Sequence, residues 1–179
     1  MKSEMIIKFW FEEIPTQAWF KKDEAFDVAL INRFSAIHKA AAKGELFNWR
    51  VTPDGRLAEI IILDQFSRNM FRNTPEAFFY DPLALMLAQE AVSLKQDQEI
   101  SKEKRSFLYM PFMHSESLQI HEVGLVLFAE MGNEGTLEYE KKHKAIIERF
   151  GRYPHRNELL GRESTPEELE FLQQPGSSF

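Results

Sequence analysis

The sequence predicts an all-α fold in which short and medium helices pack as antiparallel pairs with brief connections. Apolar residues recur at the spacing of one helix face in most segments. No segment alternates apolar and polar residues with the period of a strand, and hairpin turn signals are missing. A chain of 179 residues can bury a sizeable core. We therefore expect one helical domain over residues 1–179.

Residues that start or stop helices bound the first two elements. A helix over 1–13 is rich in apolar residues, and Pro15 breaks it because proline lacks the backbone N–H. Asp23 is a good N-cap for the second helix, since its short carboxylate can accept from free amides of the first turn. Gly44 is a natural stop for that helix.

The third helix is expected to be interior. Pro53-Asp54-Gly55 predicts a turn, and the helix after it runs from Arg56 to about Phe71. Apolar residues lie on all sides of this helix, which is typical of a buried helix. Asp64 and Arg68 are four residues apart on it and can pair. Unpaired buried charge is strongly unfavourable, so both groups must have partners.

Three helices are expected next. Asp81 and Pro82 open the first of them, with aspartate as N-cap and proline at the first helical position. The second starts at Ser101 and ends at Pro111. Ser115 can cap the third, with Glu116 in its first turn, where negative charge suits the helix dipole.

The C-terminal part carries two more helix signals. A helix that ends at Phe150 has His143 in its apolar stripe, and Gly151 terminates it. Thr165-Pro166-Glu167-Glu168 is a capping box that opens the final helix. The tail over 175–179 is expected to fray.

The most unusual stretch lies between these two helices and is strongly basic. It reads Arg149-Phe-Gly-Arg-Tyr-Pro-His-Arg-Asn-Glu-Leu-Leu-Gly-Arg162, with Tyr153 and three other apolar residues threaded between the polar ones. A basic run with apolar residues inside it should be pinned to the core. We expect its cations to face something negative.

The overall composition narrows the functional class. A net charge of −6 argues against nucleic-acid binding, which usually needs a basic face. The chain has no cysteine, which excludes disulfides and thiolate metal sites. No apolar run is long enough to span a bilayer, and the N-terminus lacks the layout of a signal peptide. We expect a cytoplasmic protein without membrane contact.

Three blocks of the sequence resemble one bacterial family, known as "domain of unknown function 924". The blocks are Ile60-Ile-Ile-Leu-Asp-Gln-Phe-Ser-Arg-Asn69, Phe107-Leu-Tyr-Met-Pro-Phe-Met-His-Ser-Glu116, and the basic stretch continued through Leu160-Gly-Arg-Glu-Ser-Thr-Pro-Glu-Glu168. Ser67 departs from the family pattern, in which proline follows Gln-Phe. The resemblance implies a compact, tetratricopeptide-like array of antiparallel helix pairs. It implies no established activity and no catalytic residues.

The Asp64 and Arg68 pair has two interpretations. It can be a buried acid poised by a cation inside a pocket, or a structural ion pair that joins packed helices. We favour the structural interpretation, because ion-pair networks also perturb titrating groups.

His114 and Glu116 have two interpretations, and neither is favoured. His114 can act as a general acid or base with Glu116 orienting it or holding a ligand. Alternatively, the segment is only a capped helix start with a hydrogen-bonded histidine. A helix N-terminus also attracts anions, which suits a binding site.

The basic stretch can be an anion clamp, because guanidinium forks match carboxylate and phosphate geometry. It can also be a network in which arginines meet Asp64, Glu116 and Glu163 and lock the C-terminal helices. We favour a mixture, with one or two arginines left for a ligand.

A metal site is not expected. His143 follows Glu140 by three residues, as in carboxylate-bridged di-metal bundles, but a second such pair is missing. A packed core histidine is the favoured interpretation. Phosphate-binding loops, serine elbows and zinc motifs are absent from the sequence, and we expect no cofactor.

Two functional hypotheses follow. The first is an inter-helix polar pocket that binds a small anionic ligand. Its candidate residues are Asp64, Arg68, His114, Glu116, Arg152, His155, Arg156, Asn157 and Arg162. If chemistry occurs there, His114 or His155 is the acid or base. The second is a helix-repeat module that binds a peptide or protein, with the polar residues serving as a structural network. The sequence identifies neither a reaction nor an oligomeric state.

Overall fold

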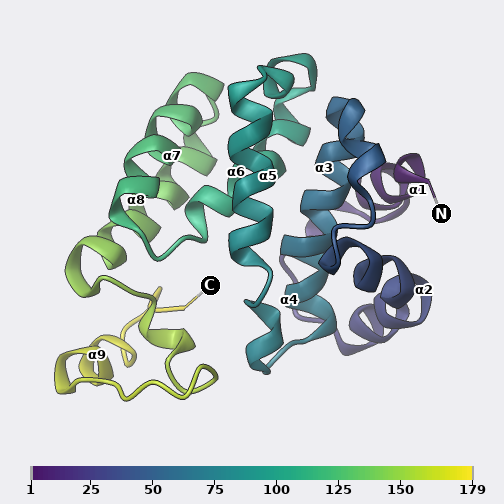
Figure 1. The fold of residues 1–179 in the computed structure, drawn as a ribbon. Coiled ribbons are helices and arrows are strands. Elements are labelled where there is room, and N and C mark those ends of the chain that lie inside the picture. The colour runs from purple at the N-terminus through teal and green to yellow at the C-terminus, as the bar shows by residue number, and fades with distance from the viewer. Residues whose placement is uncertain (1, 179) are drawn as a thin grey trace.

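The computed structural model describes residues 2–178, and this part of the chain contains helices and no strand. The all-α prediction is therefore confirmed. Figure 1 shows the helices as a curved row, with α1–α4 at one side, α5 and α6 in the middle, and α7 and α8 at the other side. The α-helices are α1 (Ser3–Lys8), α2 (Glu24–Ala42), α3 (Pro53–Ile61), α4 (Ser67–Met70), α5 (Asp81–Ser93), α6 (Lys102–Met113), α7 (Leu118–Met131), α8 (Glu134–Phe150) and α9 (Pro166–Phe171).

Shorter helical segments connect these elements. Two are π-helices, Phe9–Glu13 and Ile62–Phe66, and each continues directly from an α-helix. The 3₁₀-helices are Thr16–Ala18, Phe47–Val51, Pro75–Ala77, Gln96–Glu99 and Pro154–Arg156. The predicted first helix corresponds to α1 and the π-helix after it, while Met1 lies outside the described residues.

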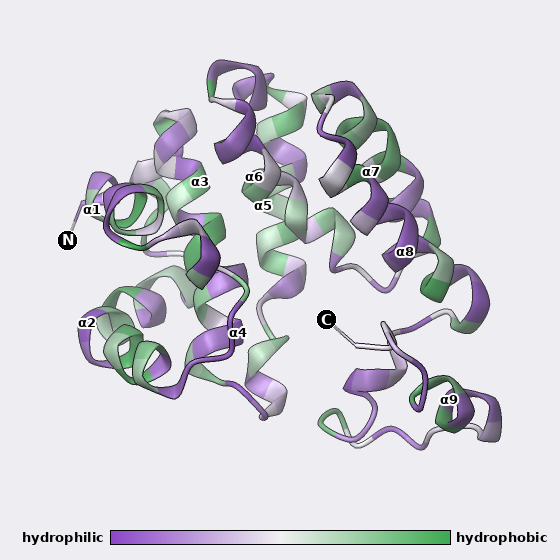
Figure 2. Cartoon of the chain, turned by 180° about the vertical axis from the view of Figure 1, so that it is seen from behind, coloured by the Kyte–Doolittle hydropathy of each residue, from purple (hydrophilic) through white to green (hydrophobic). Residues whose placement is uncertain are grey.

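Consecutive helices pack against one another along the row. α6 contacts α5 on one side and α7 on the other, and α7 also contacts α8. Figure 2 shows apolar residues gathered where the helices face each other and polar residues on the outside. Large aromatic side chains such as Trp10, Phe34 and Phe128 are fully buried there. This packing fixes the ends of α3–α6, and these ends carry the candidate site.

Several predicted helix ends are confirmed. The Asp23 carboxylate accepts from the amides of Ala25 and Phe26 at the start of α2. Gly151 ends α8 with a φ of 69°, a conformation that glycine adopts without strain. The capping box at Thr165 opens α9, with the side chains of Thr165 and Glu168 each accepting from the other's backbone amide.

The prediction of a turn at Pro53–Gly55 is wrong. α3 already begins at Pro53, and the Thr52 hydroxyl caps it by accepting from the Gly55 amide at 3.1 Å. Proline is favoured at the first helical position because its missing N–H would be unpaired there anyway. The expectation that this helix is interior is confirmed, since residues 55–67 are all buried.

The predicted end of a helix at Pro111 is also wrong. α6 continues through Pro111 to Met113, and the amide of His114 closes the last turn by donating to the Met110 carbonyl at 2.9 Å. Phe112 and Met113 are buried, so their packing holds the turn in place despite the proline.

Two predicted caps play other roles. Ser117 precedes α7, and its amide donates to the Ser115 hydroxyl at 3.2 Å, so Ser115 lies outside the helix it was expected to cap. Glu116 likewise lies before α7 and not in its first turn. Asp81 is the first residue of α5 and makes no capping bond, because its carboxylate is engaged by arginines.

The end of the described chain folds back on itself. The Ser177 hydroxyl donates to the Leu172 carbonyl at 3.2 Å, and Ser177 is buried. Phe179 lies outside the described residues, and fraying of the tail stays a prediction. Between residues 2 and 178, no helix combines the length and the apolar character needed to cross a membrane.

Candidate functional site

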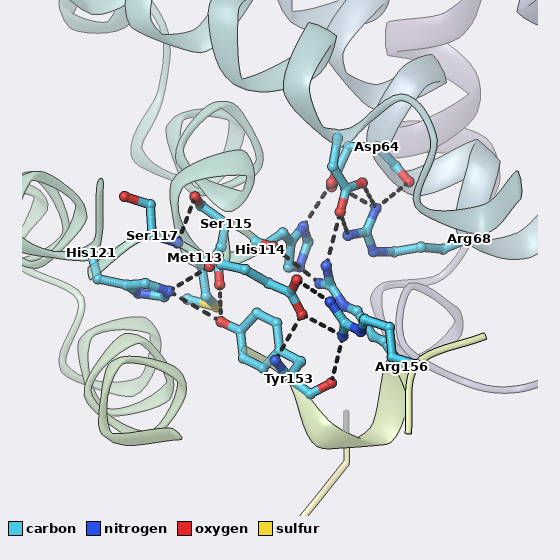
Figure 3. A network of polar contacts seen from close by, with 12 residues as sticks. Asp64, Arg68, Met113, His114, Ser115, Ser117, His121, Tyr153 and Arg156 are labelled. Carbon is cyan, nitrogen blue, oxygen red and sulfur yellow. Dashed lines mark hydrogen bonds and ion pairs between the residues drawn. The ribbon is translucent and has the colours of Figure 1, made fainter. Parts of the chain in front are cut away.

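Charged side chains from distant segments meet where the ends of α3–α6 approach the loop after α8. Figure 3 shows Asp64, Arg68, His114 and Arg156 pointing toward one another, with the Tyr153 hydroxyl directed toward Met113 and His121. We call this group and its direct partners the polar cluster. Its members are Asp64, Arg68, Asp81, His114, Glu116, Tyr153, Arg156 and Arg162.

Asp64 is the most deeply buried carboxylate of the cluster, with 0% exposure. It lies 2.7 Å from His114 Nδ1 and 2.9 Å from Arg68 Nη1, and the Gln65 amide also donates to it. Burial alone would raise the pKa of Asp64. The charges of Arg68 and His114 and the hydrogen bonds from His114 and Gln65 outweigh burial and hold this pKa well below its usual value. Asp64 is therefore ionised.

The π-helix Ile62–Phe66 brings Asp64 to this position. It lies between α3 and α4, so Asp64 sits on a widened turn inside one continuous helical segment. The Asp64 carbonyl accepts from Arg68 Nη1 at 3.0 Å, in addition to the ion pair between the two side chains. Single π turns inside α-helices occur frequently at functional sites.

Arg68 is held between two carboxylates. Its Nη1 and Nη2 donate to the two oxygens of Asp81 at 2.9 and 3.0 Å. Burial lowers the pKa of Arg68, but the charges of Asp64 and Asp81 raise it above its usual value. Both terminal nitrogens of this arginine are therefore bonded to the protein.

Arg156 is less well satisfied. Its Nη1 donates to Asp81 at the long distance of 3.3 Å, and its Nη2 donates to the His114 carbonyl at 3.1 Å. The guanidinium carbon lies 4.6 Å from the ring centre of Phe78 and 4.5 Å from that of Tyr153. Arg156 is only 6% exposed, and its Nε is buried without a hydrogen-bond partner. Burial, together with the charge of Arg68, lowers its pKa.

His114 forms a dyad with Asp64. Because Asp64 is ionised and can only accept, the proton of a neutral His114 sits on Nδ1 and is donated to Asp64. Burial and the charge of Arg68 lower the pKa of His114 and outweigh the opposite effect of Asp64. The imidazole is therefore neutral at pH 7, and its side chain is 15% exposed.

Glu116 connects the cluster to the C-terminal loop. It accepts from both terminal nitrogens of Arg162, at 2.6 and 2.9 Å, and from the backbone amide of Tyr153 at 2.8 Å. Burial alone would raise the pKa of Glu116, but the hydrogen bonds from Arg162 and Tyr153 lower it. Asn157 supports this arrangement, because its side-chain oxygen accepts from Arg162 Nε at 3.0 Å.

Not every candidate residue joins the cluster. Arg152 pairs with Glu168 through two bonds of 2.7 and 2.8 Å and also donates to the Glu163 carbonyl, which ties the loop to α9. His155 packs beside Tyr153, with ring centres 5.6 Å apart, and burial lowers its pKa to about 4. Arg152 therefore holds the loop against α9 and lies outside the cluster, whereas His155 lies at the edge of the cluster beside Tyr153.

Two members of the cluster were not among the site residues predicted from the sequence. Asp81 was assigned to a helix cap, yet it is the carboxylate that Arg68 and Arg156 share. Tyr153 was counted among the apolar residues of the basic stretch. Its hydroxyl donates to the Met113 carbonyl at 2.5 Å, which pins the loop to the end of α6. The only available signal for Tyr153 was its place between arginines.

A second buried pair adjoins Tyr153. His121 Nδ1 lies 2.7 Å from a Glu140 oxygen, and both side chains are fully buried. His121 Nε2 donates to the Ser115 carbonyl at 2.9 Å and lies 3.2 Å from the Tyr153 hydroxyl. Burial raises the pKa of Glu140 above its usual value, against the effect of His121. This pair supports the cluster from the side of α7 and α8.

The His143 side chain belongs to the same neighbourhood. Its Nδ1 donates to the Tyr139 carbonyl at 2.7 Å, one turn earlier in α8, and burial lowers its pKa to about 3. No group of three or more histidine, aspartate or glutamate side chains in residues 2–178 has an arrangement that could hold a metal ion.

A surface cavity of about 710 Å³ lies at the outer edge of the cluster and not at its centre. It is lined by Pro154, His155, Glu158, Arg162, Glu163, Ser164, Leu169 and Leu172. Two carboxylates accompany the single arginine in this lining, so its charge does not favour an anion. The electrostatic case for a site therefore rests on the cluster itself.

Comparisons with known proteins agree with this architecture. A family model described as "Bacterial protein of unknown function (DUF924)" matches residues 6–176. A solved structure of a protein of unknown function from Agrobacterium tumefaciens is 41% identical, with a TM-score of 0.90 over 96% of each chain. No curated protein matches the chain. The resemblance inferred from the three sequence blocks is thereby confirmed, and the chain belongs to the DUF924 family of bacterial proteins.

Proposed function

We propose that the polar cluster binds a small anionic ligand. The observation that carries this proposal is the state of Arg156. Its guanidinium is nearly buried, its bond to Asp81 is long at 3.3 Å, and its Nε has no acceptor. A buried cation that is only partly paired is unfavourable, and a bound anion would supply the missing acceptor.

The distribution of the carboxylates supports the same proposal. Asp81 gives one oxygen to each terminal nitrogen of Arg68, and Arg156 shares one of these oxygens at the longer distance of 3.3 Å. Asp64 is already occupied by Arg68 and His114. The protein therefore neutralises Arg68 more completely than Arg156, which has the longest ion pair among the arginines of the cluster.

The size of the ligand follows from its surroundings. The Arg156 guanidinium is enclosed between two aromatic rings, so only a compact planar or tetrahedral anion can approach it. A carboxylate or a phosphate group has this size and matches the guanidinium fork. Arg68 and Arg162 belong to the same cluster, and about a quarter or less of each side chain is exposed.

A thermal-shift titration tests the proposal. We expect phosphate, carboxylate or nucleotide ligands to stabilise the protein. At a concentration 100 times Kd, binding adds about 2.7 kcal/mol, which raises Tm by roughly 5–10 °C for a chain of this size. Arg156→Lys keeps the charge but loses the fork, and it should abolish most of this shift.

A matched control separates ligand binding from general destabilisation. Arg72 also forms a two-bond ion pair, at 2.6 and 2.8 Å to Asp27, and it lies outside the cluster. Arg72→Lys should keep the full ligand-dependent shift. The same shift in Arg156→Lys as in the control would refute the proposal.

The competing hypothesis is a helix-repeat module that binds a peptide or protein. In that case the cluster only locks the C-terminal loop, and no small anion changes Tm in a manner that depends on Arg156. The titration therefore distinguishes the two hypotheses.

A further inference from the structure

We infer that His114 is the acid–base group of this site and exchanges protons with the bound anion through Nε2. Asp64 is its positioning residue. This inference rests on the proposed anion site and adds a reaction class to it. The substrate would be an anion with an exchangeable proton on the atom next to its charged group.

The contact with Asp64 determines the tautomer of His114. Asp64 Oδ1 lies 2.7 Å from His114 Nδ1, and the ionised carboxylate has no proton to donate. Nδ1 must therefore carry the hydrogen, which leaves the lone pair of the neutral ring on Nε2. Within residues 2–178, no hydrogen bond to Nε2 occupies this lone pair.

His121 and His38 differ from His114 because their Nε2 atoms are already hydrogen-bonded. His121 has the same 2.7 Å contact to a carboxylate, but its Nε2 is used by the Ser115 carbonyl and its ring is fully buried. His38 Nε2 is bonded to the Ser67 hydroxyl at 2.8 Å. His114 combines a carboxylate on one nitrogen with an unused second nitrogen and partial exposure.

Arg156 would hold the anion beside His114. Arg156 Nη2 donates to the backbone carbonyl of His114 itself at 3.1 Å. An anion held by Arg156 therefore lies next to the His114 residue. Proton exchange requires a proton on the neighbouring atom of that ligand to reach Nε2.

The charge that His114 gains on protonation is compensated by Asp64. When Nε2 takes a proton, the ring becomes an imidazolium with N–H groups on both nitrogens. The Asp64 carboxylate compensates this charge, and the same proton returns to the substrate or to water when the ring is neutral again. Arg68 and Asp81 also act on this ring, Arg156 donates to the backbone carbonyl of the same residue, and His143 lies 6.5 Å from the ring. Burial and the charge of Arg68 keep the imidazolium from persisting at neutral pH.

Two measurements on the wild-type protein test the inference without an activity assay. The ¹⁵N shifts of labelled histidines report which ring nitrogen carries the proton, and we expect the Nδ1–H form for His114 at pH 7. Diethylpyrocarbonate acylates unprotonated imidazole nitrogens. Peptide mapping should show His114 modified while His121 and His38, the internal controls, are not.

The Asp64→Asn variant tests the positioning role. The asparagine amide can donate to Nδ1 and so favour the other tautomer, which removes the lone pair from Nε2. We expect the His114 acylation rate to fall by on the order of tenfold or more, as expected for a wrong tautomer. If this variant does not fold, the wild-type ¹⁵N shifts decide alone.

The outcomes distinguish this inference from the proposed function. A proton on Nε2 of wild-type His114 at pH 7, or acylation no faster than at His121, would overturn the inference. Inorganic phosphate that protects His114 from acylation would support both proposals. If phosphate neither protects His114 nor raises Tm, but His114 has the Nδ1–H form and reacts, the ligand class is wrong and the acid–base assignment stands.

Discussion

Replacement of Asp64 by alanine is the most direct test of the polar cluster. The variant loses a fully buried carboxylate that accepts from His114, Arg68 and Gln65. Removal of one partner from a buried ion pair costs about 3–5 kcal/mol. Arg68 keeps both bonds to Asp81, so its charge remains partly compensated. We therefore expect a loss near the lower value, about 3 kcal/mol, and a Tm lower by roughly 6–12 °C.

The assay is urea unfolding followed by tryptophan fluorescence, since Trp10 is fully buried. Asp54→Ala is the matched control, because Asp54 pairs with Lys104 at 3.0 Å but half of its side chain is exposed. An exposed pair of this kind contributes only about 0–1 kcal/mol. If the two variants lose the same free energy of unfolding, Asp64 is not a buried ion-pair partner and the description of the cluster is wrong.

Three further predictions concern groups around the cluster. Tyr153→Phe removes the hydroxyl that donates to Met113, so the free energy of unfolding measured by urea titration should fall by about 1–3 kcal/mol. Glu140→Gln should change that free energy by less than about 1 kcal/mol, because burial favours the neutral acid and a glutamine amide can still bond to His121, whereas Glu140→Ala should cost more than this. Glu168 has its pKa lowered to about 2, chiefly by Arg152, so its stabilisation is present above its usual value of 4.5 and is lost as pH falls toward 2. Urea midpoints between pH 6 and 2 should show this loss, and it should be smaller in Glu168→Gln.

Much of the fold could be predicted because its signals are local. The caps at Asp23 and Thr165 and the glycine at position 151 act within one helix turn, so the sequence alone specifies them. Proline is ambiguous because it suits both a turn and the first position of a helix. At Pro53 the Thr52 cap selects the helix start, whereas at Pro111 packing holds the helix together, and packing partners are distant in sequence.

The candidate site was predicted in outline. Asp64 and Arg68 were noticeable because charge on a helix that is apolar on all sides needs partners. Asp81 was missed because an aspartate before Pro82 is an equally good helix cap. Its choice between a backbone amide and an arginine depends on where Arg68 lies. Arg152 could not be separated from Arg156, because the residues that they face belong to other helices.

The π-helix at Ile62–Phe66 gives the site an unusual sensitivity to chain length. A π turn holds about one residue more than an α turn, so a one-residue deletion between positions 62 and 66 would let an uninterrupted α-helix form through α3 and α4. Each residue of an α-helix advances by about 100° around the axis. Because the π turn already contains the extra residue, the shortened helix would keep Arg68 in phase with α3, but it would lose the widened turn that holds Asp64. A one-residue deletion within α3 has no extra residue to remove, so it would rotate Asp64 and Arg68 by about 100° relative to the start of that helix.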